Sequence, residues 1–163
     1  MILTPHLLIG AAIGAKTHNL GLIVILGTLS HVVLDKLPHW DYPIPGIKYF
    51  KSTRNFKALF VDLLKIAADG IFACLVLILL VNKTSQENNW VYIFWGIFFA
   101  ILPDIFLFAS KVVGSENLSR KVKNFHYKFF HRPENAEKEG KITFLGLFND
   151  ILIVVLAILV FFS

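Results

Sequence analysis

The sequence predicts an all-α fold: a polytopic membrane helical bundle of about five membrane helices plus one amphipathic interfacial helix, in a single domain over residues 1–163. Composition is the first reason. Of the 163 residues, 56% are hydrophobic and only 17% are charged, whereas about a quarter of the residues in a soluble domain are charged. The second reason is that the apolar residues form long runs. A core of this size cannot bury them all, so we expect lipid to cover the rest.

Charge and cysteine content exclude two other classes of protein. The chain has a single cysteine, Cys74, so it is not a disulfide scaffold. The net charge of +5 would suggest nucleic acid as the partner of a soluble protein. In a membrane protein, however, basic residues mark the cytoplasmic loops. We therefore expect membrane lipid with anionic head groups as the partner, and no nucleic acid; no partner protein is indicated.

The first two predicted helices cover residues 4–16 and 20–37. Thr4 can cap the first helix, with Pro5 as its first residue. Small residues in the middle of this segment predict a face for close packing on another helix. The second helix is apolar at its start, gains polar residues at its far end and stops before Pro38.

The next two predicted helices cover residues 56–81 and 89–113. A short polar loop separates them, so they should form an antiparallel hairpin. Residues 56–81 contain Asp62 and Asp69, both before the apolar run that begins at Ile71. The second helix should be interrupted near its end at Pro103.

Two further helices complete the prediction. Residues 116–131 are basic and amphipathic, and they should lie on the membrane surface. Residues 143–162 are apolar apart from Asn149 and Asp150. The six predicted helices account for most of the chain.

The distribution of lysine and arginine predicts the orientation in the membrane. Residues 36–65 contain six of them and residues 111–141 contain eight, which makes fourteen of the sixteen. Positive residues are retained in the cytoplasm. We therefore expect a multi-pass protein of the cytoplasmic (inner) membrane, with its N-terminus in the cytoplasm and its C-terminus outside.

Histidine and aspartate residues fall at a similar depth in several predicted helices. Each ionisable group in a membrane segment costs a few kcal/mol, so such groups tend to face the bundle interior and to mark functional sites. A divalent ion would neutralise the carboxylates and accept imidazole ligands. In the strongest pattern, His31 and Asp35 are four residues apart and share one helical face. His39 and Asp41, beyond Pro38, can fold back toward the same place.

We predict that the ligands of a divalent metal ion, expected to be Zn²⁺, come from the following residues: His6, His31, Asp35, His39, Asp41, Asp69, Asp104, His126 and His131. His126 and His131 are five residues apart and cannot share one face of a straight helix, so each is an open candidate. For Asp62, Asp150 and His18, a hydrogen-bonding role in a polar patch is the better interpretation.

Three motifs carry a resemblance to a known family. They are TPH at residues 4–6, HVVLDKLPHWD at residues 31–41 and LPD at residues 102–104. Together they resemble the membrane-bound, metal-dependent hydrolase family, whose members are small multi-span proteins of bacteria and archaea. That family is itself similar to the zinc-dependent phospholipase C enzymes in its use of an H-x-x-x-D pair on a helix. The resemblance implies metal-dependent hydrolysis and a metal at His31 and Asp35.

The chain also departs from that family. Family members often have a PD-x-D element, whereas Pro103 and Asp104 are followed here by Ile105 and Phe106. One expected carboxylate is therefore missing. An HR-x-x-TH-type element is replaced by FHYKFFHR. The resemblance does not identify a substrate.

The leading functional prediction is a membrane-embedded hydrolase that acts on a phosphoester or lipid at the cytoplasmic leaflet. Asp104 or Asp69, if not a ligand, can serve as the catalytic general base. A metal or proton transporter and a metal-stapled structural membrane protein are the alternatives. Basic residues around the mouth of the site should bind the anionic head group of the substrate; they are Lys48, Lys51, Arg54, Arg120, Lys121 and Lys123.

Overall fold

The computed structural model describes residues 2–86, 89–130 and 143–163. All regular secondary structure in these ranges is helical, as predicted. The six predicted helices are found, each within three residues of its predicted bounds, and two short helices, α3 and α4, were not predicted. The helices are α1 (Leu3–Thr17), α2 (Leu20–Lys36), α3 (Pro45–Lys48), α4 (Phe50–Thr53), α5 (Phe56–Thr84), α6 (Trp90–Val112), α7 (Glu116–Phe130) and α9 (Phe144–Phe162).

Three of these helices, α5, α6 and α9, are long and apolar enough to cross a membrane. Large apolar side chains on them are exposed: Leu79 by 64%, Phe94 by 60% and Leu159 by 58%. Exposed apolar surface on this scale indicates contact with lipid. Helices α1 and α2 have 15 and 17 residues, fewer than the ~20 that a full span needs.

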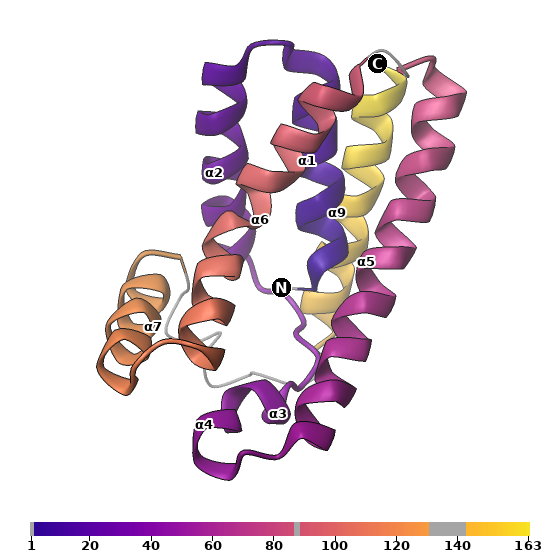
Figure 1. Ribbon diagram of the computed structural model, residues 1–163. Coiled ribbons are helices and arrows are strands. Elements are labelled where there is room, and N and C mark those ends of the chain that lie inside the picture. The colour runs from indigo at the N-terminus through magenta and orange to yellow at the C-terminus, as the bar shows by residue number, and fades with distance from the viewer. Residues whose placement is uncertain (1, 87–88, 131–142) are drawn as a thin grey trace.

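Helix α1 is the centre of the bundle and packs against α6, α9, α2 and α5. Figure 1 shows the α1–α2 turn and the C-terminus at the top, which we call the upper end, and the α3–α4 turn at the lower end. The predicted close-packing face of α1 lies against α6. A Cβ atom added to Gly96 would lie 2.1 Å from the carbonyl oxygen of Gly10, so only glycine permits this approach.

The start of α1 differs from the prediction. The helix begins at Leu3, and Ile2, not Thr4, occupies the cap position without a side-chain hydrogen bond. Instead, Asp69 on α5 accepts hydrogen bonds from the backbone N–H of Leu3 and from the hydroxyl of Thr4. A carboxylate satisfies the free N–H groups of a helix start better than a hydroxyl does, because the helix dipole favours negative charge there.

The predicted interruption of α6 at Pro103 is wrong, because α6 continues through this residue to Val112. Proline removes one N–H from the helix and displaces the carbonyl one turn before it. Membrane helices tolerate this where neighbouring groups use the released carbonyls. The carbonyl that Pro103 leaves without its usual donor is that of Phe99, and the next carbonyl in this turn, that of Ala100, accepts a hydrogen bond from His31 of α2.

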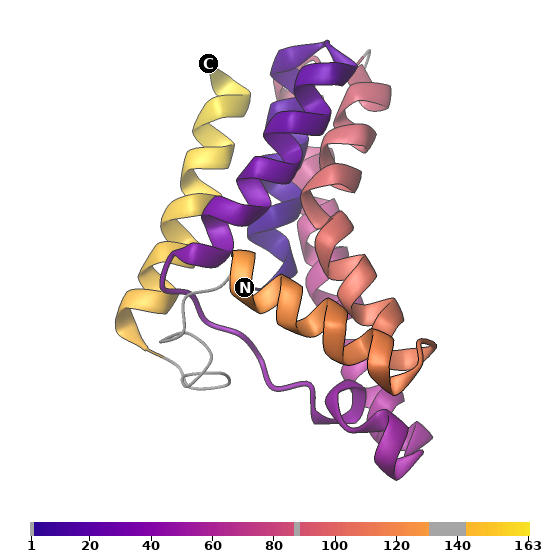
Figure 2. The ribbon, with the colours of Figure 1, turned by 90° about the vertical axis from the view of Figure 1, so that its left-hand side faces the viewer.

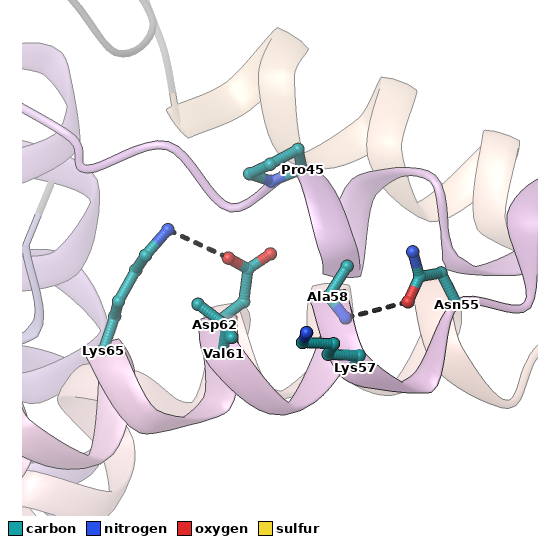
Figure 3. Close-up of a pocket in the computed structure, with 7 residues that line it drawn as sticks. All are labelled: Pro45, Asn55, Lys57, Ala58, Val61, Asp62 and Lys65. Carbon is teal, nitrogen blue, oxygen red and sulfur yellow. Dashed lines mark hydrogen bonds and ion pairs between the residues drawn. The ribbon is translucent and has the colours of Figure 1, made fainter.

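At the lower end, polar contacts hold the short helices in place. Asp62 of α5 accepts a hydrogen bond from the N–H of Ile47 at 3.0 Å and pairs with Lys65 at 3.1 Å. Lys65 also donates to the carbonyl of Pro43. A hollow of about 310 Å³ lies between α3 and the start of α5, beside this pair (Figure 3). The predicted hydrogen-bonding role of Asp62 agrees with these contacts.

Helix α7 lies against the lower half of α6 and the end of α2 (Figure 2). The hydroxyl of Ser115 accepts a hydrogen bond from the N–H of Leu118 and so caps the helix start. Its apolar residues Phe125 and Phe129 are more than half exposed, whereas His126 is buried. Helix α7 therefore presents a histidine to the bundle and aromatic rings to its surroundings.

Candidate metal centre

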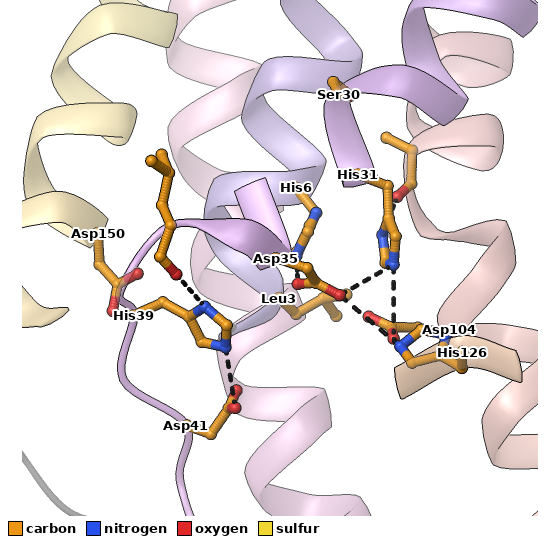
Figure 4. Close-up of polar contacts among 12 residues, drawn as sticks. Leu3, His6, Ser30, His31, Asp35, His39, Asp41, Asp104, His126 and Asp150 are labelled. Carbon is orange, nitrogen blue, oxygen red and sulfur yellow. Dashed lines mark hydrogen bonds and ion pairs between the residues drawn. The ribbon is translucent and has the colours of Figure 1, made fainter. Parts of the chain in front are cut away.

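The last turns of α2 supply the first two groups of the centre, His31 and Asp35. The helical period places them on one face, and the Nε2 atom of His31 lies 3.2 Å from Oδ2 of Asp35. Both side chains are almost completely buried. Figure 4 shows the two side chains pointing toward the same space between the helices.

The hydrogen bonding of His31 determines which nitrogen can bind a metal. Its Nδ1 atom lies 2.8 Å from the carbonyl oxygen of Ala100. A carbonyl only accepts hydrogen bonds, so Nδ1 carries the proton and donates. In the neutral ring, Nε2 then keeps its lone pair, and this atom faces Asp35. A backbone carbonyl in this position is the usual orienting partner of a metal-binding histidine.

Two other helices complete the group. The Nε2 atom of His31 lies 3.9 Å from Oδ1 of Asp104 on α6. His126 of α7 lies 3.7 Å both from Asp35 and from Asp104. One ligand atom from each of the four residues lies within 4.8 Å of every other. We call His31, Asp35, Asp104 and His126 the four-residue cluster.

His6 of α1 lies against this cluster. Its Nε2 atom is 3.2 Å from Oδ1 of Asp35, and its ring centre is 4.6 Å from that of His31. The side chain is fully buried, and its Nδ1 atom has no hydrogen-bond partner among the described residues. Because Nε2 faces Asp35, His6 can add a third imidazole nitrogen, and a fifth donor group, to the centre.

The donor chemistry of the cluster fits a divalent ion. It combines two imidazoles with two carboxylates, the ligand types that zinc accepts. Two carboxylates carry two negative charges, which a divalent cation balances. Asp35 is buried and Asp104 has an exposed side-chain fraction of 38%, so the cluster has one enclosed side and one open side.

Three other predicted ligands lie apart from the cluster. Asp69 accepts the hydrogen bonds at the start of α1, and Tyr42 lies 3.5 Å from it. His39 and Asp41 pair with each other at 3.2 Å in the connection after α2. His131 lies outside the described residues.

The connection that carries His39 and Asp41 is held by α9. The N–H of Trp40 donates to Asp150 at 3.2 Å, and the side chain of Asn149 donates to the carbonyl of Pro38 at 2.8 Å. These are the two polar residues that interrupt the last apolar segment. Their role here is the hydrogen-bonding one predicted for Asp150.

The six predicted substrate-binding residues lie on α3, α4 and α7 and at the C-terminal end of α4. Lys51 donates to the carbonyl of Ser110 at 2.7 Å and so ties α4 to α6. Arg120 donates to Asn117, and Lys121 is exposed. The others lie over aromatic rings: Lys48 over Tyr49, Arg54 over Phe50 and Lys123 over Tyr127.

A cavity of about 400 Å³ opens beside the cluster and is lined by Asp35, Asp104 and His126. Two polar residues that sequence reasoning missed also line it, Tyr42 and Lys111. Burial and the nearby Asp69 carboxylate raise the pKa of the Tyr42 phenol, which therefore stays protonated. Lys111 is seven residues after Asp104, a spacing that predicts a shared helical face and that could have identified it.

Comparison with protein-family models, with curated proteins and with solved structures finds no match for this chain.

Proposed function

We propose that the protein is a membrane-embedded, metal-dependent hydrolase that acts on a phosphoester or lipid at the cytoplasmic leaflet of the inner membrane, with Zn²⁺ as its ion. One observation carries the proposal: four nitrogen and oxygen donors from three helices lie within 4.8 Å of one another, and three of the four residues, Asp35, Asp104 and His126, line a cavity. The resemblance to membrane-bound hydrolases uses the same His31, Asp35 and Asp104 and supports the same activity.

The chain offers separate groups for binding the ion and for moving a proton. His31, Asp35 and His126 are buried and would hold the metal. A zinc ion supplies a nucleophile near neutral pH and polarises a phosphoryl oxygen. The partly exposed Asp104 borders the cavity, so its carboxylate can take a proton from water there. Asp69 is engaged by the start of α1, which favours Asp104 as the base.

Depth and charge support the membrane arrangement. His31 lies eleven residues after Leu20, which is about 16 Å from the upper end of the bundle, in a hydrocarbon layer about 30 Å thick. The basic residues of α3, α4 and α7 gather near the lower end. We therefore infer that α1 and α2 also lie in the membrane, that α7 lies at its surface and that the lower end faces the cytoplasm, with the N-terminus inside and the C-terminus outside.

The two alternative functions require features different from these. A transporter needs a polar route from the site to both faces. Toward the upper end, however, the packed core of α1 and its neighbours is apolar, with Leu8, Leu77 and Ile93 buried. A structural staple has a closed shell of ligands, whereas Asp104 borders a cavity. Hydrolysis fits the arrangement better than either.

The test combines metal analysis with turnover. We expect the purified chain to bind zinc and to hydrolyse a member of a phospholipid panel, and both properties to be lost on chelation or in Asp35→Asn, which keeps the size of the side chain. His18→Asn is the matched control, because His18 lies at the upper end and asparagine tolerates its left-handed backbone conformation. Stoichiometric metal without turnover of any lipid would favour a structural or transport site.

A further inference from the structure

The cavity beside the four-residue cluster is lined by apolar and by charged residues, and the charged ones are Asp35, Asp41, Asp104 and Lys111. Ile101 and Ile105 of α6 and Leu63 and Ile66 of α5 form an apolar wall. Among the described residues that line the cavity, Lys111 is the only lysine or arginine. It lies on the same face of α6 as Asp104, two turns nearer the lower end.

The apolar part of the cavity reaches the outer surface of the bundle. Leu63 and Ile105 line the cavity, yet they are exposed by 38% and 42%. Helix α6 packs mainly on α1 and α2, whereas α5 packs mainly on α1 and α3. Figure 1 shows α5 and α6 moving apart toward the lower end. Because both helices are long enough to span a membrane, the opening between them faces acyl chains.

The length of this cavity wall along α6 matches the thickness of the hydrocarbon layer of one leaflet. Ile101 and Lys111 are ten residues apart on α6, which is about 15 Å along the helix axis. Half of a hydrocarbon layer about 30 Å thick has the same length. A lipid with its acyl chain beside Ile101 and Ile105 therefore places its head group near Lys111.

We propose that the ligand of this cavity is an anionic phospholipid that enters sideways from the membrane, between α5 and α6, and that Lys111 binds its phosphate group. The lysine ammonium is a suitable partner for phosphate, and the apolar wall accounts for the acyl chain. This inference deepens the proposed function, and it rests on that function only for the hydrolysis of the bound lipid. Lipid binding itself requires no hydrolysis.

Photolabelling tests the access route without relying on activity. The full chain is placed in phosphatidylcholine nanodiscs with chelator and with phosphatidic acid that carries a diazirine on its acyl chain. We expect the label on α5 around Leu63 and Ile66 and on α6 around Ile101 and Ile105. Ile105→Trp fills the opening and should lower this labelling about fivefold or more. Phe106→Trp is the matched control, because Phe106 is 63% exposed and is not among the residues that line the cavity.

Two further variants test the opening and the charge. Leu63→Trp obstructs the opening from α5 and replaces Ile105→Trp if that variant does not fold, as judged by gel filtration. Lys111→Gln should weaken labelling by phosphatidic acid about fivefold and leave labelling by a neutral diacylglycerol analogue unchanged. Lys83→Gln, on an exposed residue at the upper end, should change neither.

The possible outcomes separate this inference from the proposed function. Label spread equally over all lipid-facing helices in every variant would overturn the lateral route. Displacement of the lipid by soluble glycerol phosphate would also overturn it, because that result indicates access from water. If the lipid binds as described but zinc restores no hydrolysis, the hydrolase proposal fails alone. If hydrolysis proceeds unchanged in Lys111→Gln and Ile105→Trp, the present inference fails alone.

Discussion

The imidazole of His31 is oriented by the backbone of another helix: its Nδ1 atom donates to the carbonyl oxygen of Ala100 at 2.8 Å. This bond turns Nε2 toward Asp35 and Asp104. It joins α2 to α6 at the level of the cluster, in the turn that precedes Pro103. The geometry of the site therefore depends on helix packing as well as on the side chains that compose it.

The first prediction concerns the ligands. His31→Ala should weaken zinc affinity by more than about 10-fold, because it removes a donor whose orientation is already fixed. Elemental analysis of the purified variant and competition with a chelator measure this change. His18→Asn should retain the wild-type metal content. Full zinc binding by His31→Ala would remove His31 from the centre.

The sequence could predict the part of this site that lies on one helix. His31 and Asp35 are visible as a pair because the helical period brings residues four apart onto one face. The contact of His126 with Asp35 joins residues 91 positions apart, and only the packing of α7 against α2 and α6 creates it. No local pattern distinguishes His126 from His131.

The depth of a residue along a helix predicts the layer of the membrane in which it lies, but it does not predict where its side chain points within that layer. Asp69 falls at a depth similar to that of the cluster, but its carboxylate points to the start of α1. The free N–H groups of that helix end compete for it. Conversely, Lys111 is one of the basic residues that predict the orientation in the membrane. It also lies on the same face of α6 as Asp104 and lines the cavity, which its charge alone does not predict. Hydropathy predicted the long helices well, because lipid contact selects long apolar runs.

The second prediction tests the support that α9 gives to the connection after α2. Asn149→Leu removes the donor to the carbonyl of Pro38 while keeping a similar volume, so the free energy of unfolding should fall by about 1–3 kcal/mol. Hydrogen exchange in residues 38–42 should accelerate. Metal content should stay near the wild-type value, because the four-residue cluster lies on α2, α6 and α7. Unchanged exchange would show that Asp150 alone holds this segment.

The third prediction compares two glycines inside helices. Gly96→Ala should destabilise the bundle by about 1–3 kcal/mol, because the added Cβ atom overlaps the backbone of Gly10. Gly70→Ala should stabilise it by about 0.5–1 kcal/mol, since the nearest atom to its added Cβ is a side-chain carbon of Leu3 at 3.5 Å. Thermal unfolding in one detergent measures both. Equal midpoints would mean that α1 and α6 do not approach this closely.

The last prediction concerns the basic face of α7. Arg120, Lys121 and Lys123 lie on a helix whose His126 reaches the cluster while Phe125 and Phe129 are exposed. If α7 lies along the membrane surface, replacing the three basic residues by glutamine should weaken binding of the purified chain to anionic liposomes by roughly fivefold for each charge, and the loss should shrink as salt is added. Zinc content should not change, because none of the three is a member of the cluster.

The double variant Lys16→Gln/Lys83→Gln, at the upper end, removes charge from the opposite side and should have little effect. A parallel loss of zinc and of liposome binding would instead show that these residues position His126.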